Sequence, residues 1–293
     1  MRIILNNGKY VNKVASTALS LLLLDDLSGS TGAFSLRRLK SSYSGNAIQV
    51  RRSSDNTTQD IGFVNNELDT ASLNSFCSGT NGFVTIWYNQ SDTSNNAIQT
   101  TATNQPKIYD SSTGVELENG KPAIKFIKSL QTWLEVTDTS FGNIGDAISN
   151  FSVFKINTGT NAYPVIFSKS YNNDGSIAPS LTSSNGKLHI WIDGEMFTDL
   201  GSDLRGSQVL FNNINLLGSN GLKMYIDSTL ISQQTTTQNL TGTNTYKFAI
   251  GRNNQGTGYY TDGTIQEIIL FSNDQTSNKT TIETDINTNY SIY

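Results

Sequence analysis

Short runs of alternating apolar and polar residues, separated by polar turns, occupy most of the 293-residue chain. A period of two is typical of strands that bury one face, so these runs predict strands rather than helices. The expected strands are residues 48–52, 83–88, 107–109, 123–127, 133–136, 151–155, 165–168, 187–192, 208–211, 222–226, 246–250 and 264–271. Many short strands at close intervals predict an all-β sandwich of two facing antiparallel sheets.

Two segments depart from this pattern and predict short helices, one near each end of the sandwich. In Ala33–Leu39 the apolar residues fall at helix-compatible spacing while the arginines point elsewhere. Near the C-terminus, Ile282, Ile286 and Tyr290 recur every four residues after a polar stretch that can cap a helix. We therefore expect a helix at each of these places.

Asn-Gly pairs mark two expected hairpin turns, because asparagine and glycine accept a positive φ at low cost. The turns are Ser183–Gly186 and Gly218–Gly221. Glycine is frequent, with 24 residues against 4 prolines, and only 15% of the chain is charged. This composition fits strands joined by turns and supports the all-β prediction.

The first 30 residues differ from the rest and predict an N-terminal arm in front of one all-β domain at 31–293. Residues 2–5 indicate a strand closed by the turn Asn6-Asn7-Gly8. The apolar run 18–24 resembles a short signal peptide, but Asp25 follows it without a small-residue cleavage site, and it is too short to cross a bilayer. An apolar arm on a polar protein must bury itself, so we expect it to anchor the chain. The expected anchoring residues are Ile3, Ile4, Leu5, Tyr10, Val11, Leu21, Leu22 and Leu23.

The net charge, the single cysteine and the single histidine each argue against some classes of function. A net charge of −4 gives no general attraction to phosphate backbones, so nucleic acid is not an expected partner. The basic clusters at 37–40 and 51–52 are expected to be a solvated face or internal ion pairs.

The single cysteine, Cys77, excludes an intrachain disulfide and is expected to be a buried apolar residue. The single histidine, His189, lies in an apolar strand and is expected to be packed rather than catalytic.

Residues 33–110 carry a recognisable set of short motifs. These are Ser41–Gly45, Gln49-Val50, Arg52, Ser54-Asp55, Asp60-Ile61, Phe76-Cys77, Gly79-Thr80, Tyr88 and Gln90-Ser91. The set resembles the catalytic domain of fungal-type arabinofuranosidases, and more closely its descendants in the virion proteins of tailed phages. The resemblance implies a concanavalin A-like jelly roll, related to the laminin-G-like lectin domains.

The resemblance also implies where catalytic carboxylates would lie. Glycoside hydrolysis ordinarily uses two carboxyl groups that flank the scissile bond. The family has a glutamate in a Glu-Asn-Gly segment and an aspartate in a Gly-Gly-Asp-Asn segment, where this chain has Ser184-Asn185-Gly186 and Gly251-Arg252-Asn253-Asn254. A third family aspartate corresponds to Asn89. An amide has no proton to donate and a hydroxyl is a poor unaided nucleophile, so we expect no catalytic residues.

A scaffold without these acids still offers a face for sugar. The expected carbohydrate-binding residues are Asn253, Asn254, Gln255, Tyr259 and Tyr260. Tyrosine faces pack on sugar C–H groups while amides satisfy hydroxyls. Trp191 is a second candidate, although burial in the core or in an interface is the simpler interpretation for it. The acidic residues Asp193, Glu195, Asp199 and Asp203 are interpreted as a solvated loop, so neither a metal nor a cofactor is expected.

Three functional hypotheses follow. The first is a non-catalytic phage virion protein, a head fibre, capsid decoration or tail appendage, assembled in the host cytoplasm. It would bind other virion proteins through the arm, form a homo-oligomer, with a trimer favoured, contact no membrane and adhere to glycans. The second is a free or surface-attached bacterial carbohydrate-binding protein. The third is an arabinofuranosidase-like glycoside hydrolase.

Overall fold

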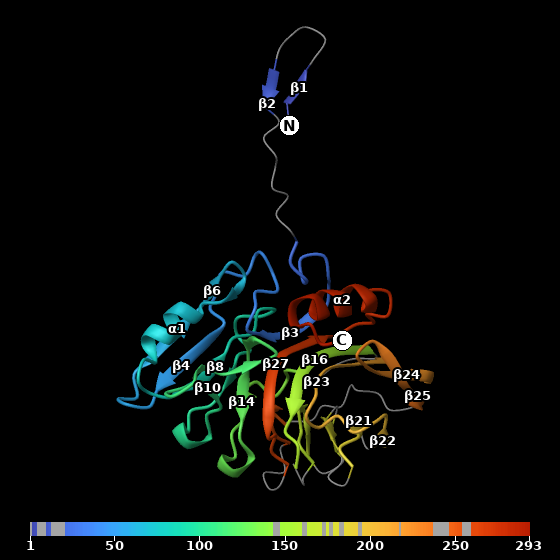
Figure 1. The fold of residues 1–293 in the computed structure, drawn as a ribbon. Helices are drawn as coiled ribbons and strands as arrows, with labels where there is room; N and C mark the ends of the chain where they lie inside the picture. The colour runs from blue at the N-terminus through green and yellow to red at the C-terminus, as the bar shows by residue number, and fades with distance from the viewer. Residues whose placement is uncertain are drawn as a thin grey trace.

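The protein is mostly β structure with two α-helices, in a computed structural model (Figure 1). The structure describes residues 2–4, 10–12, 21–142, 147–159, 163–171, 174–175, 178–181, 185–192, 195–216, 218–236, 246–253 and 259–293. The expected residues Leu5, Asn254, Gln255, Ser184 and Asp193 lie outside this description.

Most strands belong to one continuous, strongly bent sheet of antiparallel neighbours. Its members are β3 (Ser30–Ser35), β4 (Ile48–Arg52), β5 (Thr58–Ile61), β8 (Gly82–Trp87), β9 (Ala97–Ile98), β10 (Lys107–Asp110), β11 (Gly114–Val115), β14 (Ile124–Phe126), β15 (Leu134–Val136), β16 (Ala147–Ile156), β17 (Phe167–Ser168), β23 (Gln208–Leu216), β24 (Gly218–Ile226), β25 (Thr229–Thr236), β26 (Phe248–Ile250) and β27 (Gly263–Phe271). Each segment that the alternation predicted as a strand overlaps one of these or β21, so the all-β prediction is confirmed.

Smaller sheets and helices complete the fold. The three-stranded sheet consists of β20 (Ala178–Leu181), β21 (Leu188–Ile192) and β22 (Glu195–Leu200). The remaining elements are β1 (Arg2–Ile4), β2 (Tyr10–Asn12), β6 (Phe63–Val64), β7 (Glu67–Leu68), α1 (Thr70–Phe76), η1 (Ala102–Asn104), β12 (Leu117–Glu118), β13 (Lys121–Pro122), η2 (Lys128–Leu130), β18 (Ser170–Tyr171), β19 (Asp174–Gly175) and α2 (Lys279–Tyr290).

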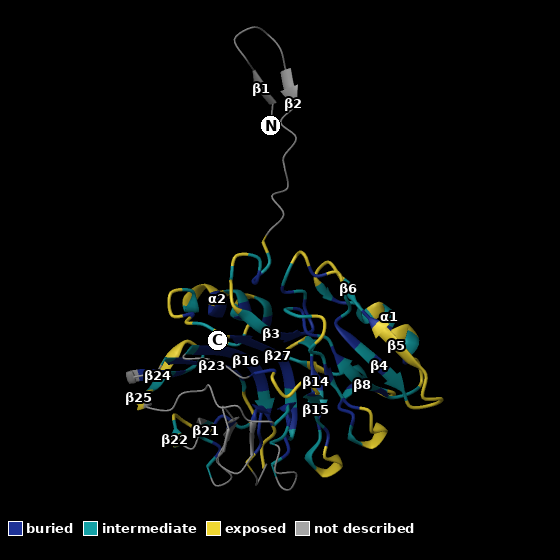
Figure 2. Ribbon diagram, turned by 180° about the vertical axis from the view of Figure 1, so that it is seen from behind, coloured by how far each residue is buried: buried dark blue, intermediate teal, exposed yellow. Residues whose placement is uncertain are grey.

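Two apolar cores lie on opposite faces of the strands β3, β27, β16 and β23. The larger fills the sandwich and includes Phe34, Trp87, Phe154 and Phe211. The smaller lies under α2, which covers the other face of these strands (Figure 1). Because both faces are covered, these strands are buried almost throughout, as the dark blue interior of Figure 2 shows.

The helix expected at Ala33–Leu39 is wrong, because these residues begin with strand β3. β3 pairs with the C-terminal half of β27, with Phe34 opposite Ile268. Beyond it, the side chain of Gln90 accepts a hydrogen bond from the Leu39 amide and donates to the carbonyls of Ser35 and Arg37. Long-range partners therefore satisfy the backbone groups that a helix would have paired locally.

The expected C-terminal helix is confirmed as α2. Ile282, Ile286 and Tyr290 are buried against the sheet, as their spacing predicted. The helix is also held by charge, because Arg37 forms ion pairs with Glu267 of β27 at 2.9 Å and with Asp285 of α2 at 2.6 Å. Burial alone would lower the pKa of Arg37, but the Glu267 carboxylate raises it above its usual range.

The basic clusters are thus partly internal ion pairs, as expected. Arg52 pairs with Asp55 at 2.6 Å, and its guanidinium lies over the Phe76 ring. The pair is partly exposed, so it contributes little to stability.

The two expected hairpins differ in outcome. Leu181 pairs with Leu188 across the first turn, and Gly186 has a φ of +67°. At the second, β23 and β24 are antiparallel neighbours, with Asn215 opposite Leu222, but Gly218–Gly221 is assigned to β24, where Gly218 also pairs with Thr236. The prediction that Gly218–Gly221 forms the turn is therefore wrong, because pairing with β25 extends β24 back to Gly218.

The arm contains the expected N-terminal strand. β1 pairs with β2, with Ile3 opposite Val11 and Ile4 opposite Tyr10. Further along, Leu21 is 66% exposed, Leu22 is half-buried, and Leu23 is buried in the core under α2. Leu23 therefore serves the domain's own core, although it lies before the boundary expected at residue 30. No helix among the described residues is long and apolar enough to cross a membrane.

Candidate functional site: an aromatic row beside the smaller sheet

Of the five expected sugar-binding residues, the structure describes Asn253, Tyr259 and Tyr260. Arg252 and Tyr260 form an isolated antiparallel bridge, which brings Asn253 and Tyr259 close to one another. Asn253 and Tyr259 are half-buried, whereas Tyr260 is only 6% exposed. Tyr259 is therefore better exposed to a ligand than Tyr260.

Backbone hydrogen bonds align this loop base with two other segments. The Thr261 hydroxyl donates to the carbonyl of Val165 at 2.6 Å, and the Ile166 amide donates to the carbonyl of Pro179 at 3.0 Å. Pro179 lies in β20, which pairs with β21 so that Ser180 is opposite His189. Residues 259–261, 163–166, β20 and β21 are thus neighbours, although they are distant in sequence.

Four aromatic side chains from these segments form a continuous row, which we call the aromatic row: Tyr259, Tyr163, His189 and Trp191. Successive ring centroids are 6.0, 5.6 and 5.5 Å apart. Tyr163 is 39% exposed and Trp191 is half-buried, so both present ring surface to solvent. Trp191 lies in neither apolar core, which removes the simpler interpretation that burial in the core explains it.

His189 is the packed histidine that its strand context predicted. It is 5% exposed and lies between the rings of Tyr163 and Trp191. Burial lowers its pKa, and the negative charge of Asp199 opposes this only in part. His189 is therefore neutral near pH 7, and it spaces its two aromatic neighbours.

Charged residues beside the row are engaged with one another. The Arg252 guanidinium stacks on Trp133, 3.3 Å from its ring centroid, and pairs with Glu135 at 3.3 Å. Glu135 also forms an ion pair with Lys247. Asp203 pairs with Arg205 at 2.7 Å. The described residues contain no group of three or more histidine, cysteine or acidic side chains that could hold a metal.

Asn89 has a structural role. Its Oδ1 accepts hydrogen bonds from the amides of Ala33 at 2.8 Å and Ser91 at 3.0 Å, and its Nδ2 donates to the carbonyl of Thr31 at 3.1 Å. The last bond requires a donor, which an ionised carboxylate lacks. An amide at this position therefore fixes β3 in place.

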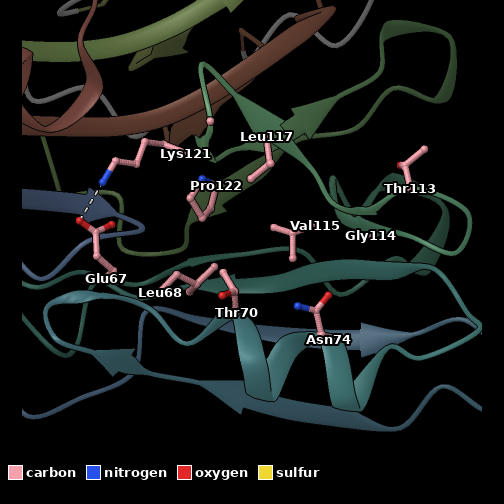
Figure 3. Close-up of a pocket in the computed structure, with 11 residues that line it drawn as sticks. Glu67, Leu68, Thr70, Asn74, Thr113, Gly114, Val115, Leu117, Lys121 and Pro122 are labelled. Atoms are coloured by element: carbon pink, nitrogen blue, oxygen red, sulfur yellow. Dashed lines mark hydrogen bonds and ion pairs between the residues drawn. The ribbon is translucent and has the colours of Figure 1, made fainter.

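A second hollow, of about 470 Å³, lies between α1 and the hairpins that follow it (Figure 3). Leu68, Val115, Leu117 and Pro122 give it an apolar wall, and the Glu67–Lys121 ion pair, at 3.0 Å, closes one end. No aromatic side chain lines it. It lacks the stacking surface for a sugar that the aromatic row offers.

Cys77 is fully buried, as expected of a small apolar residue. Burial raises the pKa of its thiol to about 11, and the charge of Arg52 counters this weakly. The thiolate is the reactive form, so this cysteine is chemically inert in the folded protein.

Comparison with known proteins agrees with this architecture. Residues 28–127 match the family model described as "Alpha-L-arabinofuranosidase B, catalytic". A GH54 α-L-arabinofuranosidase soaked with a cyclic sulfate inhibitor superposes with a TM-score of 0.65 at 18% identity, over 88% of this chain and 62% of that one. The fold is that of the α-L-arabinofuranosidase B catalytic domain.

A second arabinofuranosidase structure, complexed with arabinofuranosyl-alpha-1,2-xylobiose, gives a TM-score of 0.62 at 17% identity and covers the same shares of the two chains. The chain thus spans about three fifths of the length of these solved relatives. No curated protein matches the chain. The jelly roll is confirmed, and the aromatic row lies outside the segment that the family model matches.

Sequence reasoning found Tyr259 and Trp191 but missed Tyr163. Tyr163 lies in a polar loop without periodicity, and only the hydrogen bonds of residues 165 and 166 bring it to the row. Its one signal was the pair Tyr163-Pro164, an aromatic residue in an otherwise polar loop.

Proposed function

We propose that the protein binds carbohydrate through the aromatic row without hydrolysing it. The carrying observation is an exposed tyrosine, Tyr163, that contacts Tyr259 and continues through His189 to Trp191, on a fold shared with arabinofuranosidases. Aromatic rings offer apolar faces with polar tips, which suits sugar rings that carry C–H and hydroxyl groups on the same face.

The absence of hydrolysis is part of the proposal and rests on the resemblance. Asn253 stands where the family has its acid, and its amide cannot donate a proton at neutral pH. Of the acidic residues near the row, Asp199 acts on His189, and Asp262 follows Thr261. If the protein is a hydrolase after all, one of these carboxylates is the first to test.

The test is a titration of the whole chain with soluble neutral oligosaccharides, measured by calorimetry. Tyr163→Ala should weaken the affinity for the oligosaccharide by about threefold to tenfold, which is the effect of losing one aromatic contact. Tyr293→Ala is the matched control, because Tyr293 is exposed by 51% and lies away from the row on the C-terminal residue. Equal affinities for the two variants would contradict the proposal.

Hydrolysis is tested separately with chromogenic furanosides. We expect no turnover above background. Turnover that disappears in Asp199→Asn or Asp262→Asn would show a working hydrolase and overturn the non-catalytic part of the proposal while leaving the sugar site intact.

The virion hypothesis remains a second candidate, supported by the apolar strands β1 and β2 in front of the domain. It includes anchoring to other virion proteins and a trimer. Because Leu23 and Leu24 belong to the core, the truncation that tests it should remove residues 1–20 only. We expect the truncated protein to lose its oligomers, measured by light scattering, while its free energy of unfolding stays unchanged. An unchanged oligomeric state would count against this hypothesis.

A further inference from the structure

The aromatic row also indicates the shape of its ligand, provided that the proposed sugar binding holds. The row draws on three separate segments, the loop base at Tyr259, the loop at Tyr163 and strand β21. Hydrogen bonds between Thr261 and Val165 and between Ile166 and Pro179 fix the order of these segments. The order of the rings is therefore set by the sheet and not by local side-chain choice.

The rings are far enough apart to contact different sugar units. Tyr163 lies between Tyr259 on one side and His189 on the other, and Trp191 continues the row beyond His189. A single sugar ring on Tyr163 would leave Trp191 unused. Only a ligand that extends along the row contacts all three exposed rings.

The rings are not coplanar. Tyr163 is inclined by 38° to Tyr259 and by 60° to His189, and His189 by 60° to Trp191. A flat surface, such as the face of a crystalline polysaccharide, cannot lie on both Tyr163 and Tyr259, because their rings are inclined by 38° to one another. A single chain can, because rotation about each glycosidic bond lets successive units turn with the rings.

Among the described residues near the row, two cations are partnered by an acid. Arg252 is stacked on Trp133 and paired with Glu135, and Glu135 also engages Lys247. His189 is buried, and its environment favours the neutral form. Lys187, two residues before His189, adds a positive charge directly before β21. Aromatic surface is therefore the feature that the row offers along its whole length.

We infer that the aromatic row receives a single glycan chain of at least three sugar units, bound along its length. The ends of the row, Tyr259 and Trp191, distinguish this mode from capture of one terminal sugar. His189 acts as a positioning residue that keeps Tyr163 and Trp191 apart.

The experiment measures affinity against chain length for soluble arabino-, xylo- and gluco-oligosaccharides of one to six units. For whichever series binds, affinity should rise up to three units and then level off. Trp191→Ala and Tyr259→Ala should each weaken binding of the longest chain by about threefold to tenfold. Neither variant should alter the affinity for the monosaccharide by as much as twofold, because one unit occupies Tyr163 alone.

Three outcomes separate the inference from the proposal on which it rests. No binding of any series at any length defeats the proposed function. Equal affinity for the monosaccharide and the hexasaccharide, with no effect of Trp191→Ala, leaves sugar binding in place and overturns the chain inference. Stronger retention on insoluble crystalline polysaccharide than on the soluble chain also overturns it.

The proposed role of His189 in keeping Tyr163 and Trp191 apart is tested separately. His189→Phe keeps an aromatic ring in place and should retain the length dependence. His189→Ala should weaken long chains more than short ones, whereas a merely structural role would weaken all lengths equally.

Discussion

The segment matched by the family model and the segments that carry the aromatic row are built differently. Residues 28–127 are held by buried polar side chains that bond to backbone, such as Asn89 and Gln90, and by the ion pairs of Arg37. The segments of the row are aligned by hydrogen bonds to backbone carbonyls, and its side chains contact one another as rings near the surface. In the first region a side chain secures the fold, whereas in the second it is available to a ligand. The two regions should therefore respond differently to substitution.

Arg37→Met should have the largest effect. It leaves the Glu267 carboxylate buried without a cation and should cost about 3–5 kcal/mol in the free energy of unfolding, measured with urea. The double variant Arg37→Met/Glu267→Leu is the control and should recover part of the loss, because the fully buried charge is gone and only the partly exposed Asp285 loses its partner. A loss below about 1 kcal/mol for Arg37→Met alone would show that the ion pairs of Arg37 do not hold α2 to the sheet.

Gln90→Leu should follow, with a loss of about 2–4 kcal/mol. It removes the partners of the Leu39 amide and of the Ser35 and Arg37 carbonyls, all buried. Gln49→Leu is the matched control, because Gln49 bonds to Asp60 on an exposed part of the sheet and should cost little. Similar losses for the two variants would mean that the region is not held as described.

Tyr163→Ala should have the opposite effect to the two preceding variants, with little loss of stability and a clear loss of sugar affinity. We expect a change of less than about 1 kcal/mol in unfolding, since the side chain is over a third exposed and lies in a loop, together with the loss of sugar affinity given above. A large destabilisation with unchanged binding would erase the contrast between the two regions.

Acidification should give the smallest effect, confined to a narrow pH window. In the unfolded chain His189 takes up a proton near pH 6.5, whereas burial lowers its pKa in the folded protein. Stability contributed by neutral His189 is thus full above pH 6.5 and is lost as the pH falls below it, by at most about 1.4 kcal/mol per pH unit. His189→Gln should flatten the stability curve between pH 6.5 and 5, where the carboxylates of lowered pKa do not yet titrate.

The sequence predicted the strands well, because two-residue alternation is a direct consequence of burying one face. It mistook β3 for a helix, since Phe34, Leu36 and Leu39 fit a helical spacing while their true partners lie on β27 and at Gln90. The site was predicted in part. Tyr259 and Trp191 were candidates, but Tyr163 joins them only through contacts between distant segments, which no local pattern encodes.

Strand β27 has a consequence for how the chain reaches this structure. It pairs with β14 and β16, and with β3 across more than 230 residues of sequence, as at Ser35 and Glu267. During synthesis, the early strands must wait until Gly263–Phe271 has left the ribosome before their central neighbour arrives. Such distant closure slows folding and leaves unpaired edges exposed meanwhile. Nascent chains of this protein are therefore expected to depend on chaperones until β27 has emerged.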